Sequence, residues 1–195
     1  MKQSAPRKQV HPKTRTAWRQ WLAKNHATSE GVWFVYFKKT TGKPRVEYGE
    51  AVEEALCFGW IDSKSEQIDE ERTKMMFTPR NPKSGWSKLN KQRVKRLIEE
   101  GRMTEAGRAT IATAKRNGTW TALDAIEALE VPPDLAKALA ADKRAASYFD
   151  AFSPSSKKII LLWIQSAKRQ ETRNKRVAET VRQAAQNIKA NHPRG

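Results

Sequence analysis

The residues best suited to binding chemistry form a polar and aromatic set in the first half of the chain. Trp60 and Asp62 stand two positions apart in a segment with strand character, so their side chains share one face. Arg80 lies between two prolines, and a guanidinium held in place can bind an anion through two parallel hydrogen bonds. Trp86 and Asn90 stand four positions apart and share a helix face. We expect these five residues to line one pocket for an unknown small ligand.

Structural roles for the same residues remain as alternatives. Asp62 can accept hydrogen bonds from the backbone or pair with Arg80 across a hairpin, and Trp60 can pack in the core. A catalytic role for Asp62 as an acid or base is a third alternative, and it needs a raised pKa for that carboxyl group in a cleft. The sequence leaves open whether the protein is an enzyme.

A second set of cations lies near the C-terminus. Lys168, Arg169 and Arg173 belong to a basic run, and Arg169 and Arg173 are one helical turn apart. This spacing predicts an anion-binding surface for phosphate or acidic groups. A solvated helix face is the alternative interpretation.

The common catalytic and metal-binding signatures are absent from the sequence. It contains no nucleophile elbow, no phosphate-binding glycine loop and no H-E-x-x-H motif. The three histidines, His11, His26 and His192, are too far apart in the chain to suggest a metal site. Cys57 stands on the apolar side of a predicted helix, which favours a buried, inert thiol. We expect neither a metal nor a cofactor.

Positive charge dominates the composition. The 195 residues include 38 Lys and Arg against 21 Asp and Glu, which gives a net charge of +17. The excess is concentrated in residues 1–45, 86–118 and 151–195, which carry +10, +6 and +8. Clustered cations raise the local potential and favour an anionic partner, with a nucleic acid as one alternative and a solvated surface as another. The sequence has no segment suited to membrane insertion or secretion, so we expect a cytoplasmic protein.

The periodicity of apolar residues predicts an α+β fold. An antiparallel sheet with helices is expected over 14–118, followed by a connection over 119–130 and an all-helical region over 131–190. Residues 1–13 are predicted to be a disordered basic arm and 191–195 a tail. The expected strands cover 32–37, 60–68 and 72–78, with helices beginning near Thr14, Glu50, Ser87, Thr104, Pro132, Asp142, Ser153 and Gln170. Leu89, Val94, Leu97 and Ile98 are expected on the inner face of the third helix.

Several of these segments also carry a family resemblance. They are 55–63 (ALCFGWIDS), 77–80 (FTPR), 152–155 (FSPS) and 171–173 (ETR). On these residues the sequence resembles the YdeI/OmpD-associated family of bacteriocin-protection proteins, over about residues 14–188. The resemblance implies an α+β first part similar to the YjbR/CyaY-like folds, with a helical appendage. It also implies a stress role in resistance to bacteriocins or cationic peptides, without naming a catalytic residue. Because like charges repel, an anionic target suits a chain of charge +17 better than a cationic peptide does.

Overall fold

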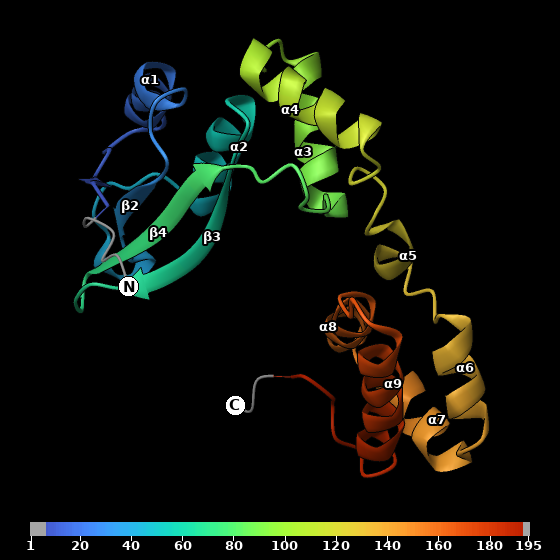
Figure 1. Ribbon diagram of the computed structural model, residues 1–195. Helices are drawn as coiled ribbons and strands as arrows, with labels where there is room; N and C mark the ends of the chain where they lie inside the picture. The colour runs from blue at the N-terminus through green and yellow to red at the C-terminus, as the bar shows by residue number, and fades with distance from the viewer. Residues whose placement is uncertain (1–6, 193–195) are drawn as a thin grey trace, which may run out of the picture. The chain divides into compact units, whose positions relative to one another are not determined.

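The computed structural model describes residues 7–192 and divides the chain into two compact units (Figure 1). The first unit ends at Ala122 and the second begins at Leu123. Each unit has a hydrophobic core of its own, so each is described by itself.

In its described residues, the first unit combines a sheet with four α-helices. Its elements in chain order are β1 (Gln9–Val10), α1 (Arg15–Asn25), β2 (Val32–Phe37), the short 3-10 helix η1 (Lys39–Thr41), α2 (Tyr48–Cys57), β3 (Trp60–Gln67), β4 (Arg72–Pro79), α3 (Lys88–Glu99) and α4 (Glu105–Arg116).

The sheet is mixed, with the strand order β1-β2-β4-β3. The three longer strands pair antiparallel, with Val32 of β2 and Asp62 of β3 both opposite Phe77 of β4. A register shift interrupts the β3–β4 pairing between Asp62 and Ser65. This sheet and the helices that follow it give the predicted α+β fold with a helical C-terminal part.

The short strand β1 differs from the sequence analysis, which places residues 1–13 in a disordered arm. For Gln9–Val10 that prediction is wrong, because these residues pair in parallel with β2. The edge of β2 offers unpaired backbone groups, and the amide of Trp33 donates to the carbonyl of Lys8 at 2.9 Å. Residues 1–6 of the arm and 193–195 of the tail lie outside the described residues.

Side-chain hydrogen bonds cap the starts of several helices. The hydroxyls of Ser87, Thr104 and Ser153 each accept a hydrogen bond from the backbone amide three residues later, and the Asp142 carboxylate does the same. Such caps satisfy amides that have no partner inside the helix. The predicted starts at these four residues are confirmed.

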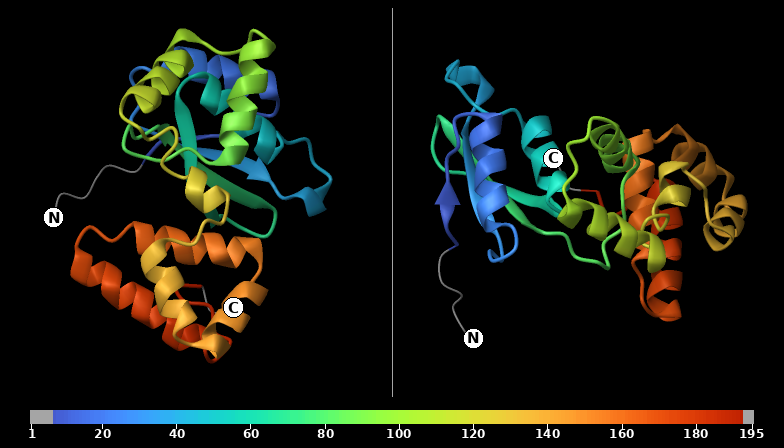
Figure 2. Two further views of the ribbon diagram at one scale, coloured as in Figure 1. Left: turned by 90° about the vertical axis from the view of Figure 1, so that its right-hand side faces the viewer. Right: turned by 90° about the horizontal axis from the view of Figure 1, so that it is seen from above.

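The core of the first unit forms between one face of the sheet and helices α1 and α2 (Figure 2). Trp18 is fully buried, and its ring centroid lies 4.9 Å from that of Phe34 and 5.3 Å from that of Phe77. Its indole Nε1 donates to the carbonyl of Ala51 at 3.0 Å, which ties α1 to α2. The N–H of a buried tryptophan usually has a hydrogen-bond partner, as it does here.

The predicted inner face of helix α3 is wrong for two of its four residues. Val94 and Leu97 are buried, but Leu89 is 54% exposed and Ile98 38% exposed. At about 100° per residue, Leu89 lies about 140° around the helix from Val94, so it leaves the inner face. Ile98 lies at the margin of the buried stripe and faces a groove described below.

Within its described residues, the second unit contains helices and connecting segments but no strand. Its helices are α5 (Asp124–Glu127), α6 (Pro133–Ala140), α7 (Lys143–Ala151), α8 (Pro154–Gln165) and α9 (Gln170–Ala184). The core of this unit contains Leu135, Phe149, Ile160, Ile164 and Ala184, all exposed by 1% or less.

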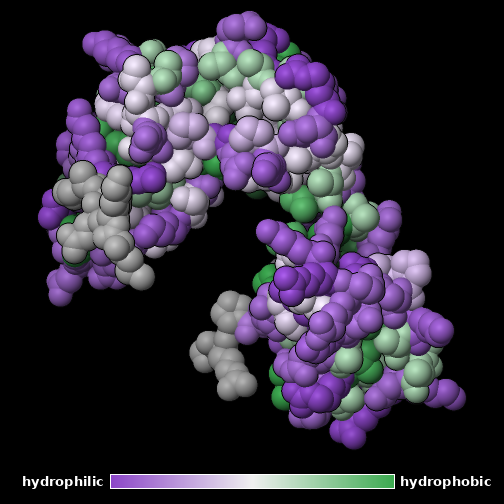
Figure 3. Space-filling view, viewed as in Figure 1, coloured by the Kyte–Doolittle hydropathy of each residue, from purple (hydrophilic) through white to green (hydrophobic). Residues whose placement is uncertain are grey.

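The surface of both units is mainly hydrophilic on the face drawn in Figure 3, and hydrophobic residues appear there in small separate areas. Among residues 7–192, no helix is both long enough and apolar enough to span a lipid bilayer.

Candidate functional site

A sharp bend between α2 and β3 positions the first two predicted site residues. Gly59 has φ +74°, a conformation that L side chains rarely adopt. A Cβ atom there would approach the Thr110 hydroxyl oxygen to 2.4 Å. The bend lets β3 begin directly at Trp60, and Arg80 closes it by donating its backbone amide to the Gly59 carbonyl at 2.9 Å.

Trp60 lies inside the core and does not line an open pocket. It is 1% exposed, and its indole Nε1 donates to the carbonyl of His26 at 3.1 Å. Its ring meets that of Trp21 edge to face, with centroids 6.0 Å apart. Trp86, the other indole expected to line the pocket, is buried as well, with 2% exposed.

Asp62 is half-buried beside the first residue of α2. Its Oδ2 accepts a hydrogen bond from the Tyr48 hydroxyl at 2.8 Å. Partial burial, together with this bond, raises the pKa of Tyr48 to about 12. Tyr48 is not among the residues that the sequence predicts for the site, since only the packing of α2 against β3 brings the two residues together.

Arg80 occupies the centre of the predicted site, but the residue is buried, with 9% of its surface exposed. It stacks on the ring of Trp86 at 4.0 Å from the centroid, and its Nη2 donates to the carbonyl of Gly85. Burial lowers the pKa of Arg80 to about 10, against the opposing effect of the Asp62 carboxylate. Its Nε is buried without a hydrogen-bond partner in the described part of the chain. Arg80 therefore anchors the segment after β4.

Asn90, the last member of the set, is half-buried near the start of α3. Its Oδ1 accepts a hydrogen bond from Arg93 Nη1 at 3.0 Å. Asp62 and Trp86 thus lie near the Arg80 guanidinium. Trp60 packs instead against Trp21 in another part of the core. Ligand binding by this set stays a prediction.

An open groove begins where the predicted set ends. Trp86 packs against the half-buried Trp120, with ring centroids 5.0 Å apart, and Trp120 forms one wall of the groove. The groove has a volume of about 410 Å³ and lies between α3 and α4. Its lining consists of Lys88, Lys91, Gln92, Val94, Lys95, Ile98, Ile111, Lys115 and Trp120. We call it the Trp120 groove.

Four lysines give the Trp120 groove its charge. Lys88, Lys91 and Lys95 follow one side of α3, and Lys115 belongs to α4. The ammonium groups of Lys91 and Lys115 each lie 5.5 Å from the Trp120 ring centroid. Among the described residues, none that lines the groove is acidic, so the arrangement favours an anion. The helical spacing of the α3 lysines can be recognised in the sequence. That Lys115 and Trp120 lie opposite them cannot, because it depends on tertiary packing.

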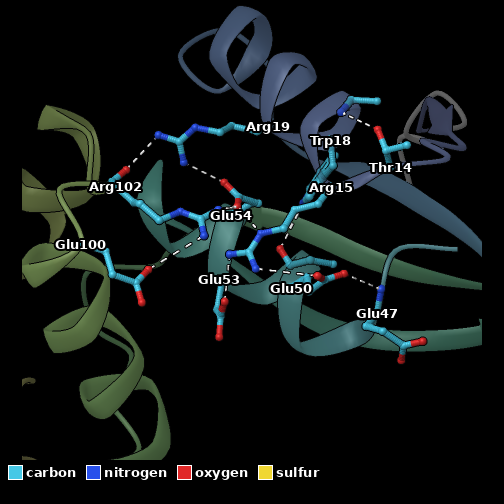
Figure 4. A network of polar contacts seen from close by, with 12 residues as sticks. Thr14, Arg15, Trp18, Arg19, Glu47, Glu50, Glu53, Glu54, Glu100 and Arg102 are labelled. Atoms are coloured by element: carbon cyan, nitrogen blue, oxygen red, sulfur yellow. Dashed lines mark hydrogen bonds and ion pairs between the residues drawn. The ribbon is translucent and has the colours of Figure 1, made fainter.

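A buried carboxylate organises a different part of the first unit (Figure 4). Glu54 is fully buried and accepts hydrogen bonds from three guanidinium groups. Arg15 Nε bonds Oε1 at 2.6 Å and Arg19 Nη1 bonds Oε2 at 2.7 Å, while Arg102 Nη2 also bonds Oε1. Both carboxylate oxygens are occupied, so the network links α1, α2 and the segment before α4 as a structural tie.

The single cysteine lies close to this tie. Cys57 is fully buried, as predicted, and burial raises the pKa of its thiol. A neutral, enclosed thiol is a poor nucleophile. Within residues 7–192, no group of three or more His, Cys, Asp or Glu side chains is arranged to hold a metal ion.

The predicted C-terminal cations have different environments. Arg173 forms a two-pronged pair with Asp134, through Nε to Oδ2 at 2.6 Å and Nη2 to Oδ1 at 2.9 Å. This pair joins α9 to α6. Lys168 and Arg169 are exposed just before α9. Of the three, Arg173 is held by a carboxylate of its own unit, and anion binding by the set stays a prediction.

The Arg173–Asp134 pair predicts a pH-dependent contribution to stability. The hydrogen bond from Arg173 holds the pKa of Asp134 below its usual value. The contribution is therefore present above about pH 4, the unfolded pKa, and is lost as the pH falls through the lower folded pKa. Arg173→Gln should destabilise the protein more at about pH 6 than near pH 2.5.

Urea unfolding followed by circular dichroism at both pH values checks this. Lys175→Gln is the control, because Lys175 bonds Glu171 within the exposed face of the same helix. A loss of stability for Arg173→Gln that is equal at both pH values would show that the pair has no such role.

The two units match different family models. Residues 10–110 match a family model described as Domain of unknown function (DUF8412). Residues 128–187 match the model described as Bacteriocin-protection, YdeI or OmpD-Associated, which confirms the resemblance for this part of the chain. No curated protein and no solved structure matches the chain.

Proposed function

The chain belongs, through residues 10–110, to the family described as Domain of unknown function (DUF8412), and we propose that it protects bacterial cells against bacteriocins by binding an anionic ligand or partner in the cytoplasm. The match of residues 128–187 to the bacteriocin-protection family is the observation that carries this proposal.

Charge supports an anionic target. The chain carries +17, and bacteriocin peptides that are themselves cationic would be repelled at long range. In the second unit, the exposed Lys168 and Arg169 offer two cations next to the start of α9. In the first unit, the Trp120 groove offers four lysines around an apolar floor. Protection then follows from binding a cellular component rather than from capture of the peptide.

A survival assay tests the proposal. The full chain is expressed in a bacteriocin-sensitive strain, and the lowest inhibitory bacteriocin concentration is measured against an empty vector. We expect the wild type to raise this concentration several-fold, and Lys168→Gln/Arg169→Gln to lose most of the gain. Lys137→Gln/Lys189→Gln removes the same charge from exposed positions of the same unit and should keep it.

The outcomes separate two failures. A wild-type chain that gives no protection contradicts the proposed function. Full protection by Lys168→Gln/Arg169→Gln contradicts the role assigned to these two cations.

Nucleic-acid association is the second candidate, and the net charge of +17 favours it. It predicts an association constant with DNA or RNA whose logarithm falls linearly with the logarithm of salt concentration. Fluorescence anisotropy of a labelled oligonucleotide, titrated at several salt concentrations, measures this slope. Absence of binding at low salt eliminates this candidate.

A further inference from the structure

We propose that the Trp120 groove binds an amphiphilic anion that carries a single aliphatic chain and an acidic head group, as a free fatty-acid-like molecule does. This inference rests on the proposed function, because it names the class of anionic ligand. It assigns a site to the groove between α3 and α4.

The floor of the groove suits an aliphatic chain. Val94 and Ile111 form buried parts of it, while Ile98 is 38% exposed beside them. Three branched aliphatic side chains together with one indole form a largely apolar wall, whose exposure to water is relieved when an apolar body covers it. The volume of about 410 Å³ lies within the range that drug-sized ligands occupy.

The rim of the groove suits an acidic head group. Lys95 of α3 and Lys115 of α4 stand on opposite walls, and Lys91 and Lys88 extend the row along α3. The aliphatic stem of a lysine can cover apolar surface while its ammonium group stays at the rim. A carboxylate at the rim would meet cations from both helices, whereas the chain would lie below them.

Two other grooves lack this arrangement. Both lie in the second unit, and the lining of each includes a carboxylate and a guanidinium: Glu130 and Arg173 in one, and Glu179 and Arg182 in the other. Opposite charges in the same groove weaken the attraction for an anion. The Trp120 groove has only cations among its charged lining residues in the described chain.

The lining also discriminates between classes of anion. A nucleotide would place the polar edges of its base and sugar against the floor, where Gln92 is the one side-chain amide in the described lining. Polar groups buried without hydrogen bonds are costly. An aliphatic chain has no such groups, so the floor favours it over a nucleobase.

Trp120 keeps the groove in a fixed shape. Its ring packs on Trp86, which in turn covers the buried Arg80 guanidinium at 4.0 Å. The Trp120 backbone amide also donates to the carbonyl of Ala114 at 3.0 Å, which attaches the wall to α4. A wall that is already in place reduces the entropy lost on binding.

Isothermal titration calorimetry of the purified full chain with decanoate tests the inference. We expect saturable binding at one site, at least about tenfold weaker binding of the uncharged 1-decanol, and none of inorganic phosphate. Lys95→Gln/Lys115→Gln should weaken decanoate binding about tenfold. The matched control Lys24→Gln/Lys83→Gln removes two exposed lysines of the same unit outside the groove and should bind as the wild type does.

A second variant keeps the test independent of the lysines. Ile98→Glu places a carboxylate at an exposed position of the floor, where the fold tolerates it, and should abolish binding. Decanoate that does not bind, or that binds Ile98→Glu as tightly as the wild type, overturns the inference. So does preferential binding to phosphatidylglycerol vesicles or to an oligonucleotide over free decanoate. Because these measurements use purified protein, they can fail while the survival assay succeeds, and the reverse.

Discussion

Replacing Glu54 by alanine is expected to lower the free energy of unfolding by about 3–5 kcal/mol, because it removes the fully buried carboxylate that three guanidinium groups share. Glu54 has no exposed surface, and Arg15, Arg19 and Arg102 all donate to it. Each of these arginines is itself mostly covered, with side-chain exposures of 25%, 34% and 32%. Three guanidinium groups would then repel one another at the junction of α1, α2 and the segment before α4.

Chemical denaturation by urea, monitored by circular dichroism, measures this loss. Glu53→Ala is the matched control one residue earlier, since Glu53 pairs with Arg15 and with Arg96 but retains 14% exposure. Arg96 is 53% exposed and can be solvated instead, so we expect a loss of about 1 kcal/mol for this control. Equal losses for the two variants would show that the complete burial of Glu54 has no special consequence.

Replacing Trp86 by alanine is expected to destabilise the first unit by about 3–5 kcal/mol. It should also weaken the binding of decanoate in the Trp120 groove. Trp86 is 2% exposed and lies between the Arg80 guanidinium and the Trp120 ring. The truncation removes an apolar side chain and leaves a cavity, and it also uncovers a buried cation that lacks one of its hydrogen bonds. Trp120 would lose the ring that holds it in place.

Urea unfolding and decanoate calorimetry measure the two effects of this substitution. Trp86→Phe is the control, because a phenyl ring preserves a surface for both Arg80 and Trp120, and it should recover most of the stability and the binding. Decanoate affinity that is unchanged in a folded Trp86→Ala protein would show that Trp120 does not depend on Trp86.

The parts of the fold that depend on neighbours along the chain were predictable. The caps at Ser87, Thr104, Asp142 and Ser153 depend on a side chain and an amide three residues away, so their residue types were sufficient. The β3–β4 hairpin was predictable for the same reason. The strand β1 was not, because Gln9–Val10 has no strand pattern of its own and is ordered by the edge of β2.

The candidate site was predictable only in part. The proximity of Asp62, Arg80 and Trp86 follows from the hairpin and the turn after it. The burial of Trp60 depends on Trp21 and His26, which come from a helix and a loop far earlier in the chain. In the same way, the Tyr48–Asp62 bond and the tie at Glu54 join residues that only tertiary packing brings together.

The strand order has a consequence for how copies of this protein meet. Strand β3 forms an outer edge of the sheet, and an edge with free backbone groups is a template on which strands of other molecules assemble. Here the register shift between Asp62 and Ser65 bends that edge, and Lys64 places a charge inside the shifted segment. These two features oppose edge-to-edge aggregation of the sheet.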